Sequence, residues 1–257
     1  MTSLAYTIDG PPDAPVLVLS GSLGSTVDMW QPQVAALGTH WRILRLDHPG
    51  HGASPIWNEP VTVSDIGQAV RELLTELGFD RVSFCGLSLG GAVGQWLAAH
   101  APESVECLVL CSTAAQFPNR DAYRQRATVV RKQGTEAISA AVVDRWFTPD
   151  FHGRQPAVVE TFRRMIESIP PEGYAACCEA VAAFDGRQDL TAIRASTLVI
   201  AGADDPAIPV EQARALCSGI AGARLLVIPQ AAHVVNVEQP EVVNTAIMEH
   251  LSEVLHA

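Results

Sequence analysis

The sequence predicts an α/β protein in which a mostly parallel central sheet is flanked by helices and carries a helical insertion. Three observations predict this fold. Short runs rich in Val, Leu and Ile alternate with longer stretches of helical periodicity. These runs are apolar at successive positions, which is typical of strands buried on both faces. Strand signals disappear between residues 116 and 189. We therefore expect a core of residues 1–115 and 190–257, with a helical lid of residues 116–189 inserted into it.

Length and composition suit one well-filled α/β domain. The chain has 257 residues, of which 48% are hydrophobic and 18% are charged, and this balance excludes disorder by low hydropathy. No apolar run reaches the length of a membrane span, and the N-terminus lacks the basic and then apolar layout of a signal peptide. We therefore expect a cytoplasmic protein.

The net charge of −11 argues against nucleic acid or an anionic membrane as a partner. A small-molecule substrate is the better expectation. If that substrate is an anion, the site must supply local positive charge against the overall negative field. We expect a monomer or a small homo-oligomer, since nothing in the sequence separates the two.

The six cysteines form no C-x-x-C pair, and four of them lie in apolar runs. Buried reduced thiols are therefore expected rather than a disulfide framework or a metal site, and we expect neither a metal nor a cofactor. The cysteines are Cys85, Cys107, Cys111, Cys177, Cys178 and Cys217.

Two apolar runs open the chain, at residues 4–8 and 15–19, and the Gly and Pro residues between them indicate a turn, so we expect two strands. Small residues at 20–25 then form a loop that exposes backbone N–H groups. A third strand is expected at residues 41–47. It ends at residues 48–52, which are too rich in glycine and proline to continue a regular element.

A helix is expected from Ser64 to about Leu77, because apolar residues recur there at the spacing of one helix face. A strand at residues 81–85, a helix at 91–100 and a buried strand at 105–111 follow it. The apolar face of the first helix consists of Ile66, Val70, Leu73, Leu74 and Leu77.

The lid is expected to consist of helices, because Arg, Glu and Ala dominate its sequence. Prolines interrupt the helical pattern at Pro149, Pro156 and Pro170-Pro171. After the lid the sheet resumes. We expect strands at residues 197–201 and 224–228, a helix from about Val210 between them, and a final helix from Pro240 to about Leu255.

The pentapeptide at residues 86–90, Gly-Leu-Ser-Leu-Gly, lies between an expected strand and an expected helix. In that context a G-x-S-x-G turn holds its serine in strained geometry, with the hydroxyl exposed at the tip. Gly86 and Gly90 lack side chains, which the close approach of strand and helix requires. We therefore interpret Ser88 as a nucleophile rather than as an incidental serine in a glycine-rich turn.

Ligands of open parallel sheets bind beyond the carboxyl ends of the strands. Asp204 and Asp205 follow the strand at 197–201, and His233 follows the strand at 224–228. A serine hydroxyl needs an imidazole to accept its proton, and the imidazole needs a carboxylate to fix its tautomer. The order Ser, Asp, His thus predicts a catalytic triad, although spacing alone does not decide between the two aspartates.

Two backbone N–H groups are expected to form an oxyanion hole. The Leu89 N–H follows the nucleophile directly, and the loop at residues 22–24 has the position of the second donor, the Leu23 N–H. The alternative is that this loop is only a flexible turn.

At this point the whole chain resembles the α/β-hydrolase fold family, and within it the 3-oxoadipate enol-lactonases of the protocatechuate branch of aromatic degradation. The narrower resemblance rests on the Ser22-Leu23-Gly24 loop and on two lid stretches. Pro49 departs from the pattern, because relatives commonly carry arginine in that loop. The resembling segments are residues 22–24 with Met29-Trp30, 47–52, 86–90, 145–149, 173–178, 202–209, and His233 with 236–240.

The resemblance implies a serine hydrolase that opens the ring of 3-oxoadipate enol-lactone. The family pattern G-x-x-D-x-x-x-P falls on Gly202, Asp205 and Pro209, so it selects Asp205 as the acid. Because such a lactone carries a free carboxylate, we expect a lid cation to bind it, and Arg145 is the preferred candidate. The alternative is that Arg145 is a solvated surface residue of the lid. Trp146 is expected to line the pocket or the lid core, and the resemblance adds Ser22 and Trp30 as substrate contacts.

Other functions use the same residues. A carboxylesterase, a carbon–carbon bond hydrolase or a cofactor-free haloperoxidase would employ the same three side chains with different lid contacts. The fold also serves as a small-molecule receptor in which turnover is incidental. A receptor needs a partner surface, and no exposed apolar patch can be identified in this sequence.

Overall fold

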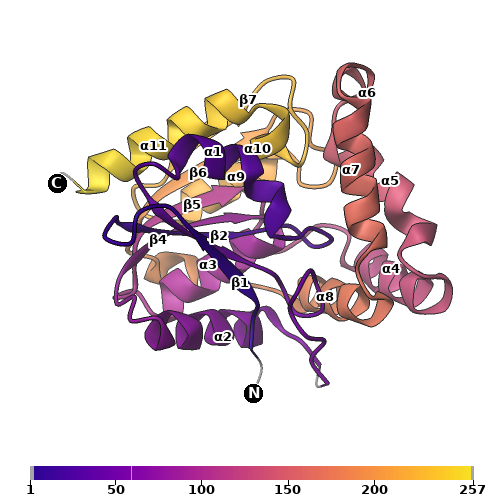
Figure 1. Cartoon of the computed structure of the whole chain (residues 1–257), viewed down its shortest axis with the longest axis horizontal. Helices are drawn as coiled ribbons and strands as arrows, with labels where there is room; N and C mark the ends of the chain where they lie inside the picture. The colour runs from indigo at the N-terminus through magenta and orange to yellow at the C-terminus, as the bar shows by residue number, and fades with distance from the viewer. Residues whose placement is uncertain (1–2, 59, 256–257) are drawn as a thin grey trace.

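The computed structural model describes residues 3–58 and 60–255. Its centre is a sheet of seven strands in the order β1-β3-β2-β4-β5-β6-β7 (Figure 1). β1 pairs with β3 in antiparallel fashion and every other neighbouring pair is parallel, so the predicted mostly parallel sheet is confirmed. The strands are β1 (Tyr6–Asp9), β2 (Val16–Ser20), β3 (Arg42–Leu46), β4 (Val82–Leu87), β5 (Val105–Cys111), β6 (Ser196–Gly202) and β7 (Arg224–Ile228).

Helices cover both faces of the sheet. α2 and α3 lie on one face, and α1 and α11 lie on the other (Figure 1). The central strands β2, β4 and β5 are almost wholly buried, as their continuous apolar runs predict. The core helices are η1 (Val27–Trp30), α1 (Gln31–Leu37), α2 (Val63–Glu76), α3 (Leu89–His100), η2 (Leu190–Ala192), α9 (Val210–Gly219), α10 (Val235–Glu238) and α11 (Pro240–Leu255).

The ends of the predicted elements shift by a few residues, and short helices were not predicted. α2 begins at Val63 rather than Ser64, because Thr62 and Asp65 form a capping box in which each side chain accepts a hydrogen bond from the other's backbone N–H. The short helices α1 and α10 have seven and four residues, too few to show a helical period.

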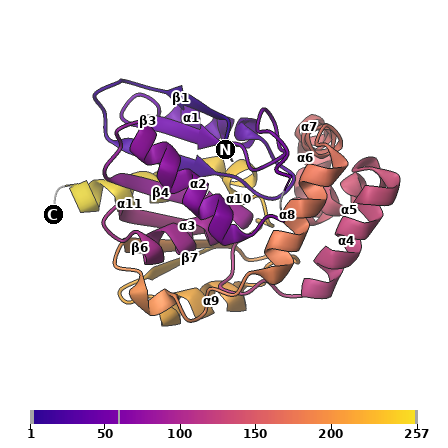
Figure 2. The same ribbon diagram turned by 90° about the horizontal axis from the view of Figure 1, so that it is seen from below.

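The lid forms a helical layer beside one end of the sheet (Figures 1 and 2). Three of its helices begin at Pro149, Pro156 and Pro171, the places where the sequence pattern breaks. Proline suits the first helical position, because its missing N–H would have no partner there. The lid helices are α4 (Arg120–Gln133), α5 (Glu136–Trp146), α6 (Pro149–Arg154), α7 (Pro156–Glu167) and α8 (Pro171–Ala183).

All six cysteines are unpaired, and all but Cys217 are buried. Within residues 3–58 and 60–255, no helix has the length and apolar character needed to cross a membrane.

The contact between α2 and α3 offers a test of the fold. A Cβ atom on Gly67 of α2 would lie 2.1 Å from the Trp96 ring of α3, whereas a Cβ on Gly153 of α6 would meet nothing within 4 Å. We expect Gly67→Ala to lower the free energy of unfolding by about 1–3 kcal/mol through overpacking. Gly153→Ala should leave it unchanged or raise it by up to about 1 kcal/mol, since alanine favours helix. Urea unfolding followed by circular dichroism measures both, and equal effects would contradict this packing.

Candidate active site

Ser88 occupies a strained turn between β4 and α3. Its backbone has φ 57° and ψ −112°, outside the regions that residues with a side chain ordinarily adopt. The turn is held from both sides, because the Ser88 N–H donates to the Cys111 carbonyl (2.9 Å) and the Thr113 hydroxyl donates to the Ser88 carbonyl (2.7 Å). The surrounding structure therefore compensates for the strain and fixes the serine at the carboxyl edge of the sheet.

The two glycines of the pentapeptide are required by contact distances. A Cβ on Gly86 would lie 2.2 Å from the Gly90 carbonyl oxygen. A Cβ on Gly90 would lie 2.0 Å from the carbonyl oxygen of Ser20, at the end of β2. No side chain fits at either distance, so the sequence pattern corresponds to a real steric need.

Asp205 and His233 meet beside this turn. The loop after β6 carries Asp205, the loop after β7 carries His233, and Asp205 Oδ2 lies 2.8 Å from His233 Nδ1. The other carboxylate oxygen of Asp205 accepts the backbone N–H groups of Ala207 (2.8 Å) and Ile208 (3.0 Å). Both side chains are buried. The carboxylate therefore holds the imidazole with Nδ1 protonated and Nε2 free to accept a proton.

Asp204, the neighbour that spacing alone could not exclude, is exposed and makes no side-chain hydrogen bond with the described part of the chain. The Asp205 carboxylate, one residue further along the chain, is the one that reaches the His233 imidazole.

Ser88 and His233 line the same cavity. Among the described residues, Ser88 Oγ and His233 Nε2 have no hydrogen-bond partner.

The backbone N–H groups of Leu23 and Leu89 make no hydrogen bond to any described residue. Leu23 lies on the loop after β2, and Leu89 is the first residue of α3, next to Ser88. An N–H at the first turn of a helix has no partner within the helix, and it carries the positive end of the helix dipole. Two unpaired donors beside the candidate nucleophile are suited to stabilising a developing oxyanion.

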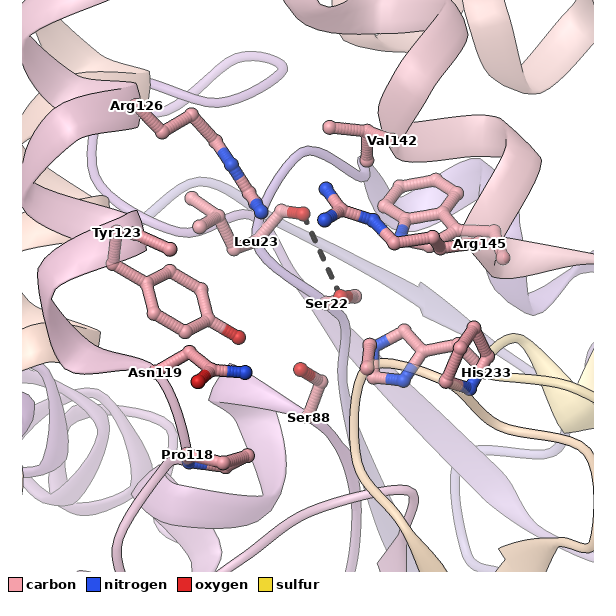
Figure 3. Close-up of a pocket in the computed structure, with 14 residues that line it drawn as sticks. Ser22, Leu23, Ser88, Pro118, Asn119, Tyr123, Arg126, Val142, Arg145 and His233 are labelled. Atoms are coloured by element: carbon pink, nitrogen blue, oxygen red, sulfur yellow. Dashed lines mark hydrogen bonds between the residues drawn. The ribbon is translucent and has the colours of Figure 1, made fainter.

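A small cavity of about 120 Å³ opens above Ser88, between the sheet edge and the lid (Figure 3). It is well below the roughly 300–1,000 Å³ of pockets for drug-sized ligands, which suits a substrate of few atoms. Its walls come from both parts of the chain: Ser22, Leu23, Ser88, Pro206, Ala207 and His233 from the core, and Pro118, Asn119, Ala122, Tyr123, Arg126, Val142, Arg145 and Trp146 from the lid or its entrance.

Two arginines reach into this cavity, Arg126 from α4 and Arg145 from α5 (Figure 3). Neither has a carboxylate within 4.0 Å among the described residues, although many lid arginines do. Burial, and after it the positive charge of Arg126, lowers the pKa of Arg145 below its usual value. The lid arginines paired with carboxylates are Arg124, Arg131, Arg154, Arg163, Arg164 and Arg187.

The predicted substrate contacts divide into two groups. Ser22, Arg145 and Trp146 line the cavity. The Ser22 hydroxyl makes only a long contact of 3.5 Å with the Leu23 carbonyl. Trp30 does not line the cavity, because η1 turns its indole into the core, where it is fully buried.

Sequence reasoning missed Arg126 and Tyr123. They lie three residues apart and therefore on one face of α4, and the Arg126 guanidinium lies 5.0 Å from the centre of the Tyr123 ring. This spacing was visible in the sequence, but α4 is rich in arginine throughout and nothing there marks the face that meets the core.

No group of three or more His, Cys, Asp or Glu side chains in residues 3–58 and 60–255 is arranged to hold a metal ion.

The chain matches a sequence profile of the alpha/beta hydrolase fold over residues 14–240. It is similar to 3-oxoadipate enol-lactonase 2 of Acinetobacter baylyi, with 40% identity over 245 residues, or 95% of this chain and 91% of that protein.

Solved structures show the same similarity. The enol-lactonase from Burkholderia xenovorans LB400 superposes with a TM-score of 0.94 at 39% identity, over 97% of this chain and 96% of that one. A thermophilic esterase from Thermogutta terrifontis, with malate bound, gives a TM-score of 0.91 at 31% identity, over 98% of this chain and 93% of that one.

The two neighbouring aspartates form a matched pair of test positions. We expect Asp205→Asn to lower kcat for 4-nitrophenyl acetate by about 10⁴-fold, because an amide cannot hold the imidazole in the required tautomer. Asp204→Asn removes the same charge one residue away and should keep near wild-type activity. Initial-rate kinetics of both variants measures the difference, and similar losses in the two would exclude the role of Asp205.

Proposed function

This chain belongs to the α/β-hydrolase fold family and is a hydrolase, and from that premise we propose that it opens the ring of 3-oxoadipate enol-lactone to give 3-oxoadipate. The reaction belongs to the protocatechuate branch of aromatic degradation. The proposal assigns the nucleophile to Ser88, the base to His233 and the acid to Asp205, with the N–H groups of Leu23 and Leu89 as oxyanion donors.

The observation that carries the substrate class is the pair of unpaired guanidinium groups above the serine. In a protein of net charge −11, two arginines without carboxylate partners in one small cavity favour an anionic ligand. The cavity of about 120 Å³ favours a compact substrate over a long-chain ester. An enol-lactone that carries one carboxylate meets both conditions.

Acylation begins when His233 Nε2 accepts the Ser88 proton and Oγ attacks the lactone carbonyl. The carbonyl oxygen becomes an oxyanion, and the Leu23 and Leu89 N–H groups stabilise it without moving. Asp205 stabilises the imidazolium through the Nδ1 hydrogen bond of 2.8 Å. Collapse of the tetrahedral intermediate breaks the ring C–O bond, and the imidazolium returns its proton to the leaving enol oxygen.

Deacylation differs from that of an open-chain ester, because the leaving enol stays attached to the acyl group. No first product departs, so the cavity must hold the whole acyl chain while a water molecule enters. His233 then activates that water, which attacks the acyl carbonyl and releases Ser88. The enol becomes the ketone of 3-oxoadipate.

The free carboxylate of the substrate is assigned to the lid end of the cavity. Arg145 was the cation expected from the sequence, and Arg126 joins it from the facing helix. The like charges of the two guanidinium groups repel one another, so an anion between them relieves that repulsion and forms charge-assisted hydrogen bonds. The substrate would thus be oriented with its ester carbonyl toward Ser88 and its carboxylate toward the lid.

A simple carboxylesterase is the second candidate, because a structurally similar relative is described as an esterase. The test uses purified protein and follows the loss of ultraviolet absorbance of the enol-lactone beside the hydrolysis of 4-nitrophenyl esters. We expect efficient turnover of the lactone and none by Ser88→Ala. Efficient turnover of the esters without turnover of the lactone would favour the esterase, and activity retained by Ser88→Ala would overturn the mechanism.

The charge at the lid end gives a separate prediction. We expect Arg145→Ala and Arg126→Ala each to raise KM for the enol-lactone by roughly 10–100-fold, the worth of a charge-assisted hydrogen bond of about 1.5–3 kcal/mol. KM for the neutral 4-nitrophenyl acetate should change little.

Arg124→Ala serves as the control, because it removes the same charge from α4 at an exposed position where Arg124 pairs with Asp121. Arg124→Ala should leave KM unchanged for both the enol-lactone and 4-nitrophenyl acetate. Equal losses on the anionic and neutral substrates would show that the two cavity arginines support the lid rather than bind an anion.

A further inference from the structure

The loop that carries the Leu23 N–H has no regular secondary structure, so its position depends on individual hydrogen bonds. The peptide plane that contains the Leu23 N–H also contains the Ser22 carbonyl. That carbonyl accepts the Ser25 N–H (3.0 Å) and the Ser25 hydroxyl (2.8 Å). The following peptide plane is fixed through the Gly24 N–H, which donates to His51 Nε2 at 3.1 Å.

His51 Nε2 can accept the Gly24 N–H because the other ring nitrogen, Nδ1, carries the proton. His51 Nδ1 lies 3.0 Å from the Pro49 carbonyl oxygen, which can only accept, so Nδ1 carries the proton. In a neutral imidazole the other nitrogen then has a free lone pair, and the Gly24 N–H points at it. Both neighbours therefore select one tautomer.

His51 is held rigidly and kept neutral. The ring is fully buried and stacks on Tyr174 of α8, with centroids 6.2 Å apart and planes at 22°. Burial, and after it the neighbouring His48, lowers the pKa of His51 to about 3. The imidazole therefore remains an acceptor for Gly24 at neutral pH.

The adjacent His48 ties the start of the same loop to the turn at Ser88. Its Nε2 lies 2.8 Å from the Gly21 carbonyl oxygen, which also accepts the Gly90 N–H (2.9 Å). Burial lowers the pKa of His48 to about 4. Two neutral buried histidines from the loop after β3 thus contact the loop after β2 on either side of Leu23.

We propose that His51 is a positioning residue of the active site, one that aims the Leu23 N–H at the developing oxyanion by fixing the peptide on its carboxyl side. It does not line the cavity above Ser88, and it acts through the Gly24 N–H. This inference rests on the proposed function, because it needs an oxyanion at Ser88. It does not depend on which ester or lactone is the natural substrate.

Two amide substitutions at this position test the acceptor role. In His51→Gln the side-chain oxygen can occupy the place of Nε2 and accept the Gly24 N–H. In His51→Asn the shorter amide can keep the donor near Pro49, but it reaches no acceptor to Gly24. Asn is one methylene shorter than Gln, so the control for packing is His51→Met, which has a volume close to that of Gln but offers no strong acceptor. A role in packing alone predicts equal effects for His51→Gln and His51→Met.

The test measures 4-nitrophenyl acetate hydrolysis by wild type, the three His51 variants and Ser88→Ala. We expect His51→Asn to lose roughly 10–100-fold in kcat with little change in KM, less than complete removal of an oxyanion donor costs. His51→Gln should stay within about threefold of wild type. Inhibition by phenylboronic acid is measured in parallel, because its Ser88 adduct places an oxygen where the oxyanion forms. Its inhibition constant should rise in His51→Asn by about the same factor as kcat falls.

The outcomes are distinguishable. Equal kcat values for His51→Gln and His51→Met, or a rise in KM without a fall in kcat, would overturn the positioning role while leaving the hydrolase intact. An inactive wild type, or activity that survives in Ser88→Ala, would overturn the proposed function and this inference with it. Thermal unfolding of each variant is recorded. His51→Met should fold and show the loss of kcat expected for His51→Asn, and it carries the test if His51→Asn does not fold.

Discussion

The close approach of β2, β4 and α3 around Ser88 is the constraint on which the rest of the site depends. Gly90 at the start of α3 lies against the end of β2, so near that a Cβ would lie 2.0 Å from the Ser20 carbonyl oxygen. The same approach lets the Gly90 N–H donate to Gly21 at 2.9 Å. Because β2 ends there, the loop that follows it begins beside the serine. Ser88 and the unpaired N–H groups of Leu23 and Leu89 are thus brought together by a contact that only glycine permits.

The sequence predicted the parts of this arrangement that depend on local chemistry. A strained turn needs glycines at fixed offsets, and strand ends that share one edge of a sheet bring their following loops together, so Ser88 and His233 could be named before the fold was known. The contacts of the lid side chains could not be predicted in the same way. Arg126 and the surface arginine Arg124 look alike in sequence, and only the tertiary structure shows which one lacks a carboxylate. Trp30 failed to reach the cavity because proximity in sequence to the loop does not determine the direction of a side chain.

Arg126 and Arg145 carry an unfavourable electrostatic free energy that an anionic ligand can reduce. Two guanidinium groups that share a partly buried cavity repel each other, and burial weakens their hydration. The remainder of the lid shows that carboxylates were available, since Arg163 of α7 contacts both Glu160 and Glu167. Arginines left without carboxylate partners in the cavity above Ser88 therefore favour a role in ligand binding over a surface role. The overall negative charge repels anions from the rest of the protein and leaves this cavity as a local exception.

The lid is joined directly to the loop after β7 that carries His233, and this connection bears on the proposed cyclic substrate. The buried carboxylate of Glu238 accepts the Ala232 N–H (2.7 Å) on one oxygen, and the N–H (3.0 Å) and hydroxyl of the lid residue Thr148 on the other. The Val234 N–H also donates to the Trp146 carbonyl at 3.0 Å. The end of α5, with its arginine, is thereby fixed relative to the imidazole. In the proposed reaction, both ends of the acyl chain remain in the cavity after the lactone opens, until water arrives. A fixed connection between Arg145 and His233 would keep the ester carbonyl aligned through that second step of the proposed reaction, which a freely moving lid would not do.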